Sequence, residues 1–410
     1  MKRTFLLIAV SLLFSQGVKS NSKKNSFISE NVSFATEQLT NLVETVKDST
    51  LFPRTSKTDG SLRCTKRNDW TEGFFPGALW YLYELNNSEE TKQSAIRWTN
   101  ALEPLKKLKS HHDIGFIMYC SYGNAFRLTE KKEYTDILIE SAESLCSRFD
   151  EKVGAIKSWN YRKAWDGKTE WFYPVIIDNM MNLELLYFAA RVTGDKRFSN
   201  IATRHAETTA RNQIRPDYSC YHVVDYDAET GEVKDKATCQ GFTDNSTWAR
   251  GQAWAIYGYT MVYRETKDKK FLKIAQRMAD YYINHPNLPS DKVPFWDFHA
   301  GVKGYDPQWN YDPSKFEVVP RDASAAAVTC SALFELSKYS GKKGRVYREN
   351  AEQMLHSLAS DSYRAKLGEN NNFLLMHSVG SIPHNNEIDV PLIYADYYFL
   401  EALKRYKELD

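Results

Sequence analysis

Apolar residues recur at helical spacing along most of the chain, in segments that are similar to one another. Four of these segments share one arrangement, a helix end followed by a short polar turn and a second helix. They begin at Phe126, Ala190, Tyr263 and Ser337, spaced 64 to 74 residues apart. Self-similarity at such a period is typical of stacked helical hairpins. The pattern therefore predicts an array of helix pairs.

The two helices of each pair differ in how their apolar residues are arranged. The first helix, as in "IDNMMNLELLYFAA" from Ile177, is apolar almost all round, which predicts a helix buried on every side. The second, as in "YTDILIESAESLCSRF" from Tyr134, carries one apolar stripe with acids elsewhere, so one face meets water. Buried and half-exposed helices thus alternate along the chain.

About twelve helices follow between Ser26 and the C-terminus, which makes about six pairs. Six buried helices ringed by six amphipathic ones predict an all-α fold, an (α/α)6 barrel. No Pro-, Gly- or Ser-rich linker divides the chain, so we expect a single domain over residues 21–410. An open solenoid of helical hairpins is the alternative, because a repeat alone does not show that the ring closes.

Two long insertions interrupt the helices, at 158–175 and from about 212 to 247. The second contains "YHVVDYDAETGEV", whose alternation predicts a β-hairpin with its turn at 229–231. Loops of this length inside a compact domain are more often functional than idle. Trp159 and His222 lie in these insertions, and we expect both to contribute to a binding site.

Composition and charge narrow the class of protein. Of the 410 residues 42% are hydrophobic and 14% are aromatic, enough for a large core, and the formal net charge is +2. Proteins that bind nucleic acid or anionic membranes need a large basic excess, so neither partner is expected.

The N-terminus reads as a secretory signal peptide over residues 1–20. Lys2 and Arg3 precede an apolar run, and small residues follow it up to Ser20. No cysteine follows the run, so no lipid anchor is expected, and no later segment is apolar for long enough to span a bilayer. The mature protein is therefore predicted to be exported, to the periplasm.

Six cysteines in a chain of this size are too sparse for a disulfide framework. Cys220 and Cys239 flank the predicted hairpin and are the best placed to pair, and the sequence leaves open whether they do. No spacing resembles a zinc site, and "DYDAET" lacks the glycine and terminal Glu of a calcium loop. No metal or other cofactor is expected.

In such a barrel the inner helices run parallel, so the residues that precede each buried helix should converge on one rim. Acids, arginines and indoles stand at these positions. They include Trp70, Asp113, Asp178, Trp248, Arg250 and Trp254. Aromatic rings with a few ionisable groups are how proteins hold sugars, because rings stack on the apolar sugar face and polar groups bind the hydroxyls. A carbohydrate site is predicted at this rim.

Asp178 and Asp113 head consecutive inner helices. Each could be a helix cap, which is a common role of aspartate at this position. As neighbours across the rim, however, two carboxylates would raise the pKa of one of them. A carboxyl that stays protonated at neutral pH is what a general acid needs. The pair therefore predicts acid–base chemistry.

Five motifs carry a resemblance to a known family. They are "WTEGFFPGALWYLYE" from Trp70, "HDIGF" from His112, "FYPVIIDNMMNLELL" from Phe172, "STWARGQAWAIYGY" from Ser246 and "EIDVPLIYADYYFLEAL" from Glu387. In this order they span nearly the whole mature chain. Together they resemble glycoside hydrolase family 88, the unsaturated glucuronyl hydrolases.

The resemblance implies an (α/α)6-barrel enzyme that removes the 4,5-unsaturated uronic acid from the non-reducing end of oligosaccharides released by polysaccharide lyases. It implies Asp178 as general acid and base, and Asp113 as the second carboxylate. The substrate contacts that it implies are Trp70, His222, Gln240, Trp248, Arg250 and Trp254. The sister family of unsaturated rhamnogalacturonyl hydrolases typically reads "RGNGW" where this chain has "RGQAW" from Arg250, which favours glycosaminoglycan-type substrates.

Several alternatives stay open. An ordinary inverting glycosidase could use Asp113 and Asp178 as base and acid, and an oligosaccharide-binding protein would need the aromatic residues but not the paired acids. Family members that prefer sulfated disaccharides carry a serine and lysine cluster, whereas Ser378 and Ser381 stand here without a lysine. The sequence therefore predicts neither the sulfation preference, nor the sugar next to the uronate, nor the oligomeric state.

Overall fold

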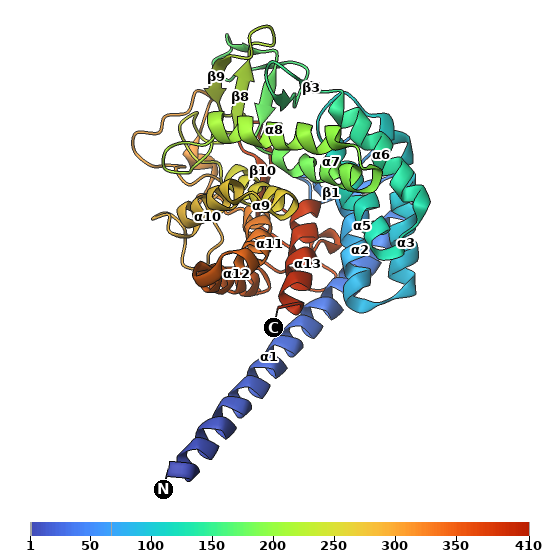
Figure 1. The fold of residues 1–410 in the computed structure, drawn as a ribbon, viewed down its shortest axis with the longest axis vertical. Coiled ribbons are helices and arrows are strands. Elements are labelled where there is room, and N and C mark those ends of the chain that lie inside the picture. Colours follow the sequence, from blue (N-terminus) through green and yellow to red (C-terminus); the bar gives the residue numbers. More distant parts are fainter. Residues whose placement is uncertain (1, 67, 410) are drawn as a thin grey trace.

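Helices are arranged in an inner and an outer layer (Figure 1). The structure is a computed structural model that describes residues 2–66 and 68–409. Side chains are described for residues 22–66 and 68–409. The inner layer of this part comprises α2 (Phe74–Asn86), α4 (Ile114–Met118) continued by η2 (Tyr119–Gly123) and α5 (Asn124–Thr129), α7 (Asn179–Thr193), α9 (Ala249–Thr266), α11 (Ala323–Tyr339) and α13 (Ile393–Lys407). The outer layer comprises α1 (Lys2–Val46), α3 (Glu89–Ala101), α6 (Lys132–Cys146), α8 (Lys196–Asn212), α10 (Lys269–Ile283) and α12 (Gly344–Leu358). Inner and outer helices alternate along the chain, as the apolar patterns predict.

The inner helices form a closed ring. Each packs against the next inner helix along the chain, and α13 packs against both α11 and α2, which joins the last inner helix to the first. This contact confirms the (α/α)6 barrel and excludes the open solenoid. Short 3₁₀ turns lie in the connections, at η1 (Glu103–Lys107), η3 (Pro313–Lys315), η4 (Gly341–Lys343) and η5 (Asn370–Asn372).

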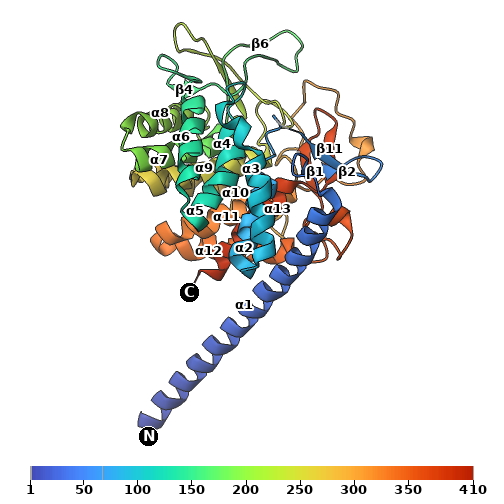
Figure 2. The ribbon, with the colours of Figure 1, turned by 90° about the vertical axis from the view of Figure 1, so that its right-hand side faces the viewer.

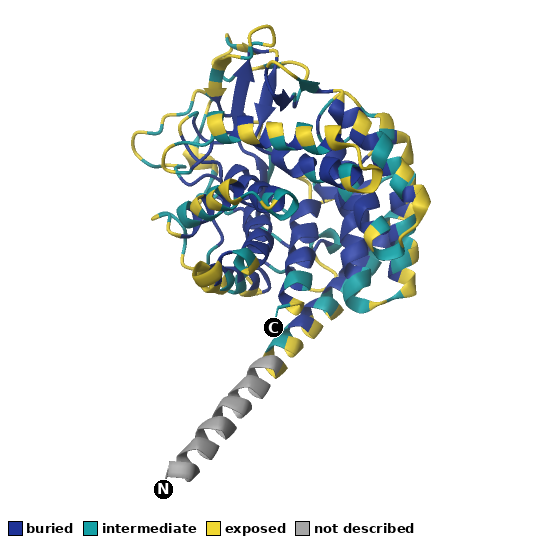
Figure 3. Cartoon of the chain, viewed as in Figure 1, coloured by how far each residue is buried: buried dark blue, intermediate teal, exposed yellow. Residues whose placement is uncertain are grey.

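Burial differs between the two layers as their sequences require. In α9 every residue from Ala249 to Val262 is buried, because neighbouring helices cover it on all sides. In α10 the buried residues form a single stripe, Phe271, Ala275, Met278, Ala279, Tyr282 and Ile283. Figure 3 shows the same contrast across the barrel, with buried inner helices and outer helices exposed on their outward sides.

The polar turns of the repeat begin the outer helices. The side chain of Asp195 accepts a hydrogen bond from the Arg197 amide at the start of α8, and Asp268 accepts one from the Lys270 amide at the start of α10. Such a cap satisfies an amide that has no partner within the helix. The repeated polar turns thus separate each inner helix from the outer helix that follows.

Short strands gather towards one end of the barrel (Figure 2). They are β1 (Phe52–Ser56), β2 (Leu62–Thr65), β3 (Phe149–Asp150), β4 (Ala155–Ile156), β5 (Arg162–Lys163), β6 (Glu170–Trp171), β7 (Pro174–Ile176), β8 (Val223–Tyr226), β9 (Val233–Ala237), β10 (Ser378–Ser381) and β11 (Asn386–Val390). The second insertion forms the predicted hairpin as β8 and β9, and β7 adds to it in an antiparallel sheet of order β7-β8-β9. Because β7 ends two residues before Asp178, this sheet fixes the entry into α7.

Three further expectations concern the chain as a whole. All six cysteines are free thiols, including Cys220 and Cys239. Across the residues that the structure describes, no helix is both long enough and apolar enough to cross a membrane. The predicted signal peptide, residues 1–20, falls on the stretch whose side chains lie outside the described residues, so it stays a prediction, as does the domain range 21–410.

Candidate active site

A cavity of about 230 Å³ lies at the end of the barrel where the inner helices begin. Six of the nine residues predicted for the site line it, namely Trp70, Asp113, Trp159, Asp178, Gln240 and Arg250. The other three, His222, Trp248 and Trp254, are buried; His222 lies 3.7 Å from Asp178, and the Trp248 ring lies 4.6 Å from the Arg250 guanidinium. The structure therefore brings the predicted residues together at one rim.

Asp178 stands at the first turn of α7 but does not cap it. Its side chain accepts no hydrogen bond from the amides of that turn, and Asp113 likewise leaves the start of α4 uncapped. Asp322 provides the contrast, because its carboxylate accepts hydrogen bonds from the Ser324 and Ala325 amides at the start of α11. The helix-cap alternative for Asp178 and Asp113 is therefore wrong.

Burial gives Asp178 the protonation behaviour of a general acid. The residue is 7% exposed, and burial raises the pKa of its carboxyl to about 7, with Arg250 acting to lower the pKa and Asp113 to raise it. Its Oδ2 atom has no hydrogen-bond partner among the described residues. A substantial fraction of this carboxyl therefore carries a proton near neutral pH.

Asp113 behaves in the opposite way. Burial by itself would raise its pKa, but the neighbouring imidazoles of His112 and His111 outweigh burial and hold the pKa below its ordinary value. Their ring nitrogens lie 3.3 Å and 3.1 Å from the carboxylate, respectively. Near neutral pH Asp113 is therefore ionised, while a substantial fraction of Asp178 still holds its proton.

The contact between Asn182 and Nδ1 of His112 fixes the tautomer of the His112 ring. Burial lowers the pKa of His112 to about 4, so the ring is neutral near pH 7. Its Nδ1 lies 3.3 Å from Nδ2 of Asn182, an amide donor, so the ring hydrogen resides on Nε2, the atom that faces Asp113. Asn182 is held in turn, because its Oδ1 accepts a hydrogen bond from the Phe116 amide at 2.8 Å.

His222 is held in one tautomer by the second insertion. Its Nδ1 accepts hydrogen bonds from the backbone amides of Cys239, at 3.0 Å, and Gln240, at 3.1 Å. Burial lowers the pKa of the ring well below its ordinary value, so the ring is neutral and carries its hydrogen on Nε2. That atom lies 3.7 Å from Oδ2 of Asp178. His222 thus presents a donor to the carboxyl.

Arg250 lines the cavity but uses its donors within the protein. Its guanidinium donates to Oδ2 of Asp322 at 2.9 Å, to the Gly380 carbonyl at 2.7 Å and to the Val379 carbonyl. It also stacks over the Trp248 ring at 4.6 Å. The residue therefore ties α9 to α11 and β10, and a contact with substrate stays a prediction for it.

Two predicted tryptophans are buried and do not line the cavity. Trp254 is fully buried, with its ring 5.2 Å from that of Phe116. Trp248 lies 4.5 Å from the His222 ring. Contacts of these two indoles with substrate stay predictions.

Three polar residues of the cavity were missed by the reasoning from sequence, Arg162, His384 and Asn386, and Ser381, which was considered only for sulfate preference, also lines it. Arg162 lies in the first insertion, where only Trp159 was considered. His384 and Asn386 lie in "HNNEID", which precedes the last inner helix, and this position was the signal that could have found them.

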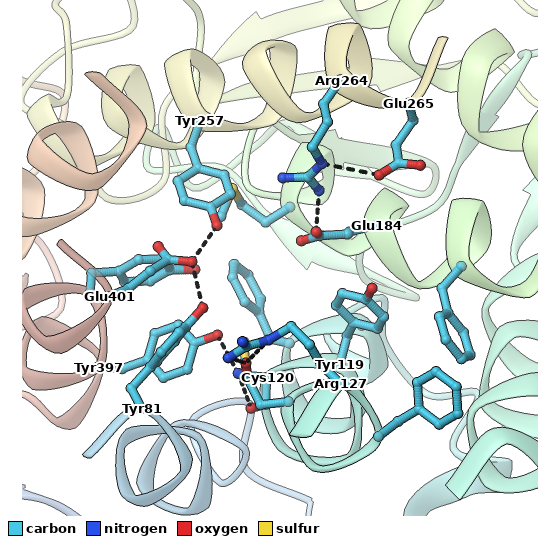
Figure 4. A pocket seen from close by; sticks show the side chains of 18 of the residues that line it. Tyr81, Tyr119, Cys120, Arg127, Glu184, Tyr257, Arg264, Glu265, Tyr397 and Glu401 are labelled. Atoms are coloured by element: carbon cyan, nitrogen blue, oxygen red, sulfur yellow. Dashed lines mark hydrogen bonds and ion pairs between the residues drawn. The ribbon is translucent and has the colours of Figure 1, made fainter. Parts of the chain in front are cut away.

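The opposite end of the barrel holds a second cavity, of about 370 Å³, whose charged side chains pair with one another (Figure 4). Glu401 accepts hydrogen bonds from Tyr81 at 2.7 Å and from Tyr257 at 2.8 Å. Arg264 forms ion pairs with Glu184 and with Glu335.

Within the described part of the chain, no group of three or more His, Cys, Asp and Glu side chains is placed to hold a metal ion.

Comparisons with known proteins agree with this geometry. The family model for Glycosyl Hydrolase Family 88 matches residues 42–282. The unsaturated glucuronyl hydrolase of Formosa agariphila is 44% identical over 416 aligned positions, which cover 100% of this chain and 99% of the relative. The unsaturated chondroitin disaccharide hydrolase of Streptococcus agalactiae is 33% identical, covering 87% of this chain and 85% of the relative.

A solved structure matches the whole barrel. The crystal structure of an unsaturated glucuronyl hydrolase specific for heparin superposes with a TM-score of 0.86 at 46% identity, covering 94% of this chain and 98% of that chain. The identity and the coverage are both far above what a shared fold alone produces. The chain belongs to glycosyl hydrolase family 88.

Proposed function

We propose that this protein is an unsaturated glucuronyl hydrolase, which removes the 4,5-unsaturated uronic acid from the non-reducing end of glycosaminoglycan-type oligosaccharides. The observation that carries the proposal is the pair of carboxyls at one rim with opposite pKa shifts, raised for Asp178 and lowered for Asp113. The names of the relatives in this family support the choice of substrate.

The first chemical step is a proton transfer to an enol ether. The protonated carboxyl of Asp178 donates its proton to carbon 4 of the unsaturated uronate. The electron pair of the double bond forms the new C–H bond, and the positive charge that develops on carbon 5 is shared with the ring oxygen. His222 can then donate from Nε2 to the Asp178 carboxylate that the transfer leaves behind.

The second step is the addition of water. The Asp178 carboxylate accepts a proton from a water molecule while the water oxygen bonds to carbon 5, which restores the protonated acid. The hemiketal that results opens to a ketone, and the hemiacetal left at carbon 1 expels the neighbouring sugar. The glycosidic bond therefore breaks without attack on carbon 1.

Asp113 acts on this cycle through its charge. It stays ionised, and its negative charge raises the pKa of Asp178, so that the acid is protonated near neutral pH. Trp70 and Trp159 line the same cavity and offer ring faces to the sugar. Ordinary glycosidases use two carboxylates on either side of carbon 1, whereas here one acid suffices.

The test is a panel of disaccharides released by lyases from chondroitin and heparin, sulfated and unsulfated, with saturated disaccharides as the matched control. We expect the ultraviolet absorbance of the enol to disappear with every substrate that is turned over, and no product from the saturated control. Cleavage of the saturated control would instead indicate an ordinary inverting glycosidase. Binding of the unsaturated disaccharides without loss of absorbance would indicate a binding protein.

We also propose export to the periplasm, on the basis of Lys2, Arg3 and the apolar run that follows them. Cell fractionation of the natural host and N-terminal sequencing of the mature protein test this. The expected mature chain begins close to Asn21. A protein that keeps residues 1–20 and stays with the cytoplasmic fraction would contradict the proposal.

A further inference from the structure

Arg162 is a charged residue of the cavity that has no acidic partner among the residues that the structure describes. It lies on β5, in the first insertion, and lines the same cavity as Asp178. Its guanidinium stacks over the Trp159 ring at 4.9 Å and donates a hydrogen bond to Nε2 of His384. Among the described side chains no carboxylate forms an ion pair with it, in contrast to Arg250, which is paired with Asp322.

The hydrogen bond from Arg162 sets the orientation of two further groups. Arginine only donates, so Nε2 of His384 must accept and the ring hydrogen must lie on Nδ1. Nδ1 therefore donates to Oγ of Ser381, which lies 2.6 Å away. With its oxygen occupied as an acceptor, the Ser381 hydroxyl keeps its own hydrogen for a group in the cavity, and Ser381 is only 6% exposed.

Burial keeps this arrangement in place. The pKa of His384 falls to about 4, because the ring is buried and lies next to the positive charge of Arg162. The ring is therefore neutral near pH 7 and does not compete with Arg162 for an anion. Two hydrogen-bond donors therefore line the cavity, the guanidinium of Arg162 and the hydroxyl of Ser381. They come from β5 and β10, which are far apart in the sequence.

We propose that Arg162, supported by Ser381, binds an acidic group of the substrate and thereby selects anionic oligosaccharides. The partly buried guanidinium needs a counter-charge, and its planar fork matches the oxygens of a carboxylate or a sulfate. Arg250 cannot serve in the same way without giving up Asp322 and the carbonyls of β10. The proposal rests on the proposed function, because it identifies the acidic group as part of that substrate.

Two sources of the acidic group share this chemistry. One is the carboxylate of the unsaturated uronate, which every substrate carries. The other is a sulfate on the neighbouring sugar, which only some substrates carry. Sulfated and unsulfated disaccharides with the same sugar skeleton distinguish them.

The test compares Arg162→Gln with Lys163→Gln. Lys163 is the next residue of β5, is exposed and does not line the cavity, so its replacement removes the same charge from the same hairpin. Arg162→Lys is a second variant that keeps the charge but loses the fork. For each protein kcat and KM are measured on both disaccharides, and the melting temperature is recorded.

We expect Arg162→Gln to raise KM by about 10-fold, the lower end for a charge-assisted hydrogen bond at a half-buried site, with kcat changed less than about threefold. Arg162→Lys should give an intermediate KM, and Lys163→Gln should match the wild type. A rise in KM on both disaccharides assigns Arg162 to the uronate carboxylate, and a rise on the sulfated one alone assigns it to the sulfate. Equal KM values for Arg162→Gln and Lys163→Gln, or a loss confined to kcat, would overturn the proposal.

Binding measured without turnover separates this proposal from the proposed function. Titration calorimetry of the unsaturated disaccharide into Asp178→Asn protein, with and without Arg162→Gln, reports the contact whether or not the wild type hydrolyses the sugar. We expect the dissociation constant to rise by about 10-fold when Arg162 is replaced. An unchanged dissociation constant would overturn the role of Arg162 even if the enzyme is active.

Discussion

Nε2 of His222 lies 3.7 Å from Oδ2 of Asp178, and the neutral His222 ring carries its hydrogen on that nitrogen. The separation is long for a hydrogen bond, as is common for catalytic groups before substrate binds. A neutral donor at this place can stabilise the Asp178 carboxylate after proton transfer without adding a positive charge that would lower the pKa beforehand. The neutral His222 ring therefore does not oppose the raised pKa of Asp178.

We predict that Asp178→Asn lowers kcat by roughly 10²- to 10⁴-fold, the usual share of general acid catalysis. The fold should survive, because Asp178 caps no helix. The melting temperature at pH 8 should rise, because the wild type then buries an ionised carboxylate with a pKa of about 7 and the amide does not ionise. Rates of enol loss and thermal unfolding measure the two effects, and a fully active Asn variant would exclude Asp178 as the proton donor.

Solvent deuterium should enter the product at carbon 4. Hydration of the enol ether delivers a proton from Asp178 to that carbon, and this proton exchanges with solvent in each cycle. Direct attack at carbon 1 leaves carbon 4 untouched. Nuclear magnetic resonance of product formed in heavy water measures the deuterium at carbon 4. A carbon 4 without deuterium, before any later exchange, would rule out the hydration mechanism.

The dependence of kcat/KM on pH should follow the Asp178 carboxyl. The rate falls as pH rises through about 7, because the general acid loses its proton. The pKa of Asp113 lies below its ordinary value, so this residue stays ionised through the pH range in which Asp178 titrates and adds no acidic limb there. Asp113→Asn should move the alkaline limb to lower pH, because it removes a negative charge that raises the pKa of Asp178. An alkaline limb that stays in place in this variant would contradict the coupling.

Two tryptophans of the first insertion should differ in what they do. Trp159 lines the cavity, so Trp159→Ala should raise KM with little change in the melting temperature. Trp171 is 1% exposed and donates to Asp235 at 2.8 Å, so Trp171→Ala should cost about 3 to 5 kcal/mol of unfolding free energy. Denaturant unfolding and steady-state kinetics on both variants give the comparison. A Trp159→Ala protein with normal KM and reduced stability would show that Trp159 only packs within the fold and does not bind substrate.

Arg250→Gln should destabilise the fold as well as weaken binding. It leaves the carboxylate of Asp322 buried without a counter-charge, which costs about 3 to 5 kcal/mol. The exposed pair Arg345–Glu349 is the control, and Arg345→Gln should leave the stability nearly unchanged. Any additional rise in KM, roughly 10- to 150-fold if a charge-assisted bond to substrate is lost, would show that Arg250 also touches the sugar. Unchanged stability in Arg250→Gln would contradict the anchoring role assigned here.

The sequence by itself determined the two alternating layers of helices and placed Asp113 and Asp178 at one rim. An all-round apolar helix such as α7 has no face to leave in water, and a striped helix such as α10 has one, so the two layers can be read from the pattern alone. Because parallel inner helices begin at one rim, Asp113 and Asp178 could be placed together before any coordinates were known. The contact of α13 with α2, by contrast, depends on the curvature of the whole array, and a repeat does not specify it.

Only the tertiary structure decided the chemical state of each group. The tautomer of His222 depends on amides of Cys239 and Gln240, and that of His384 on Arg162, all distant in the chain. The same holds for Arg250, whose hydrogen bonds to the carbonyls of Val379 and Gly380 cannot be read from the sequence pattern. Hydrogen bonds and pKa values are properties of neighbours in space, and a linear pattern records which faces are buried but not which atoms meet there.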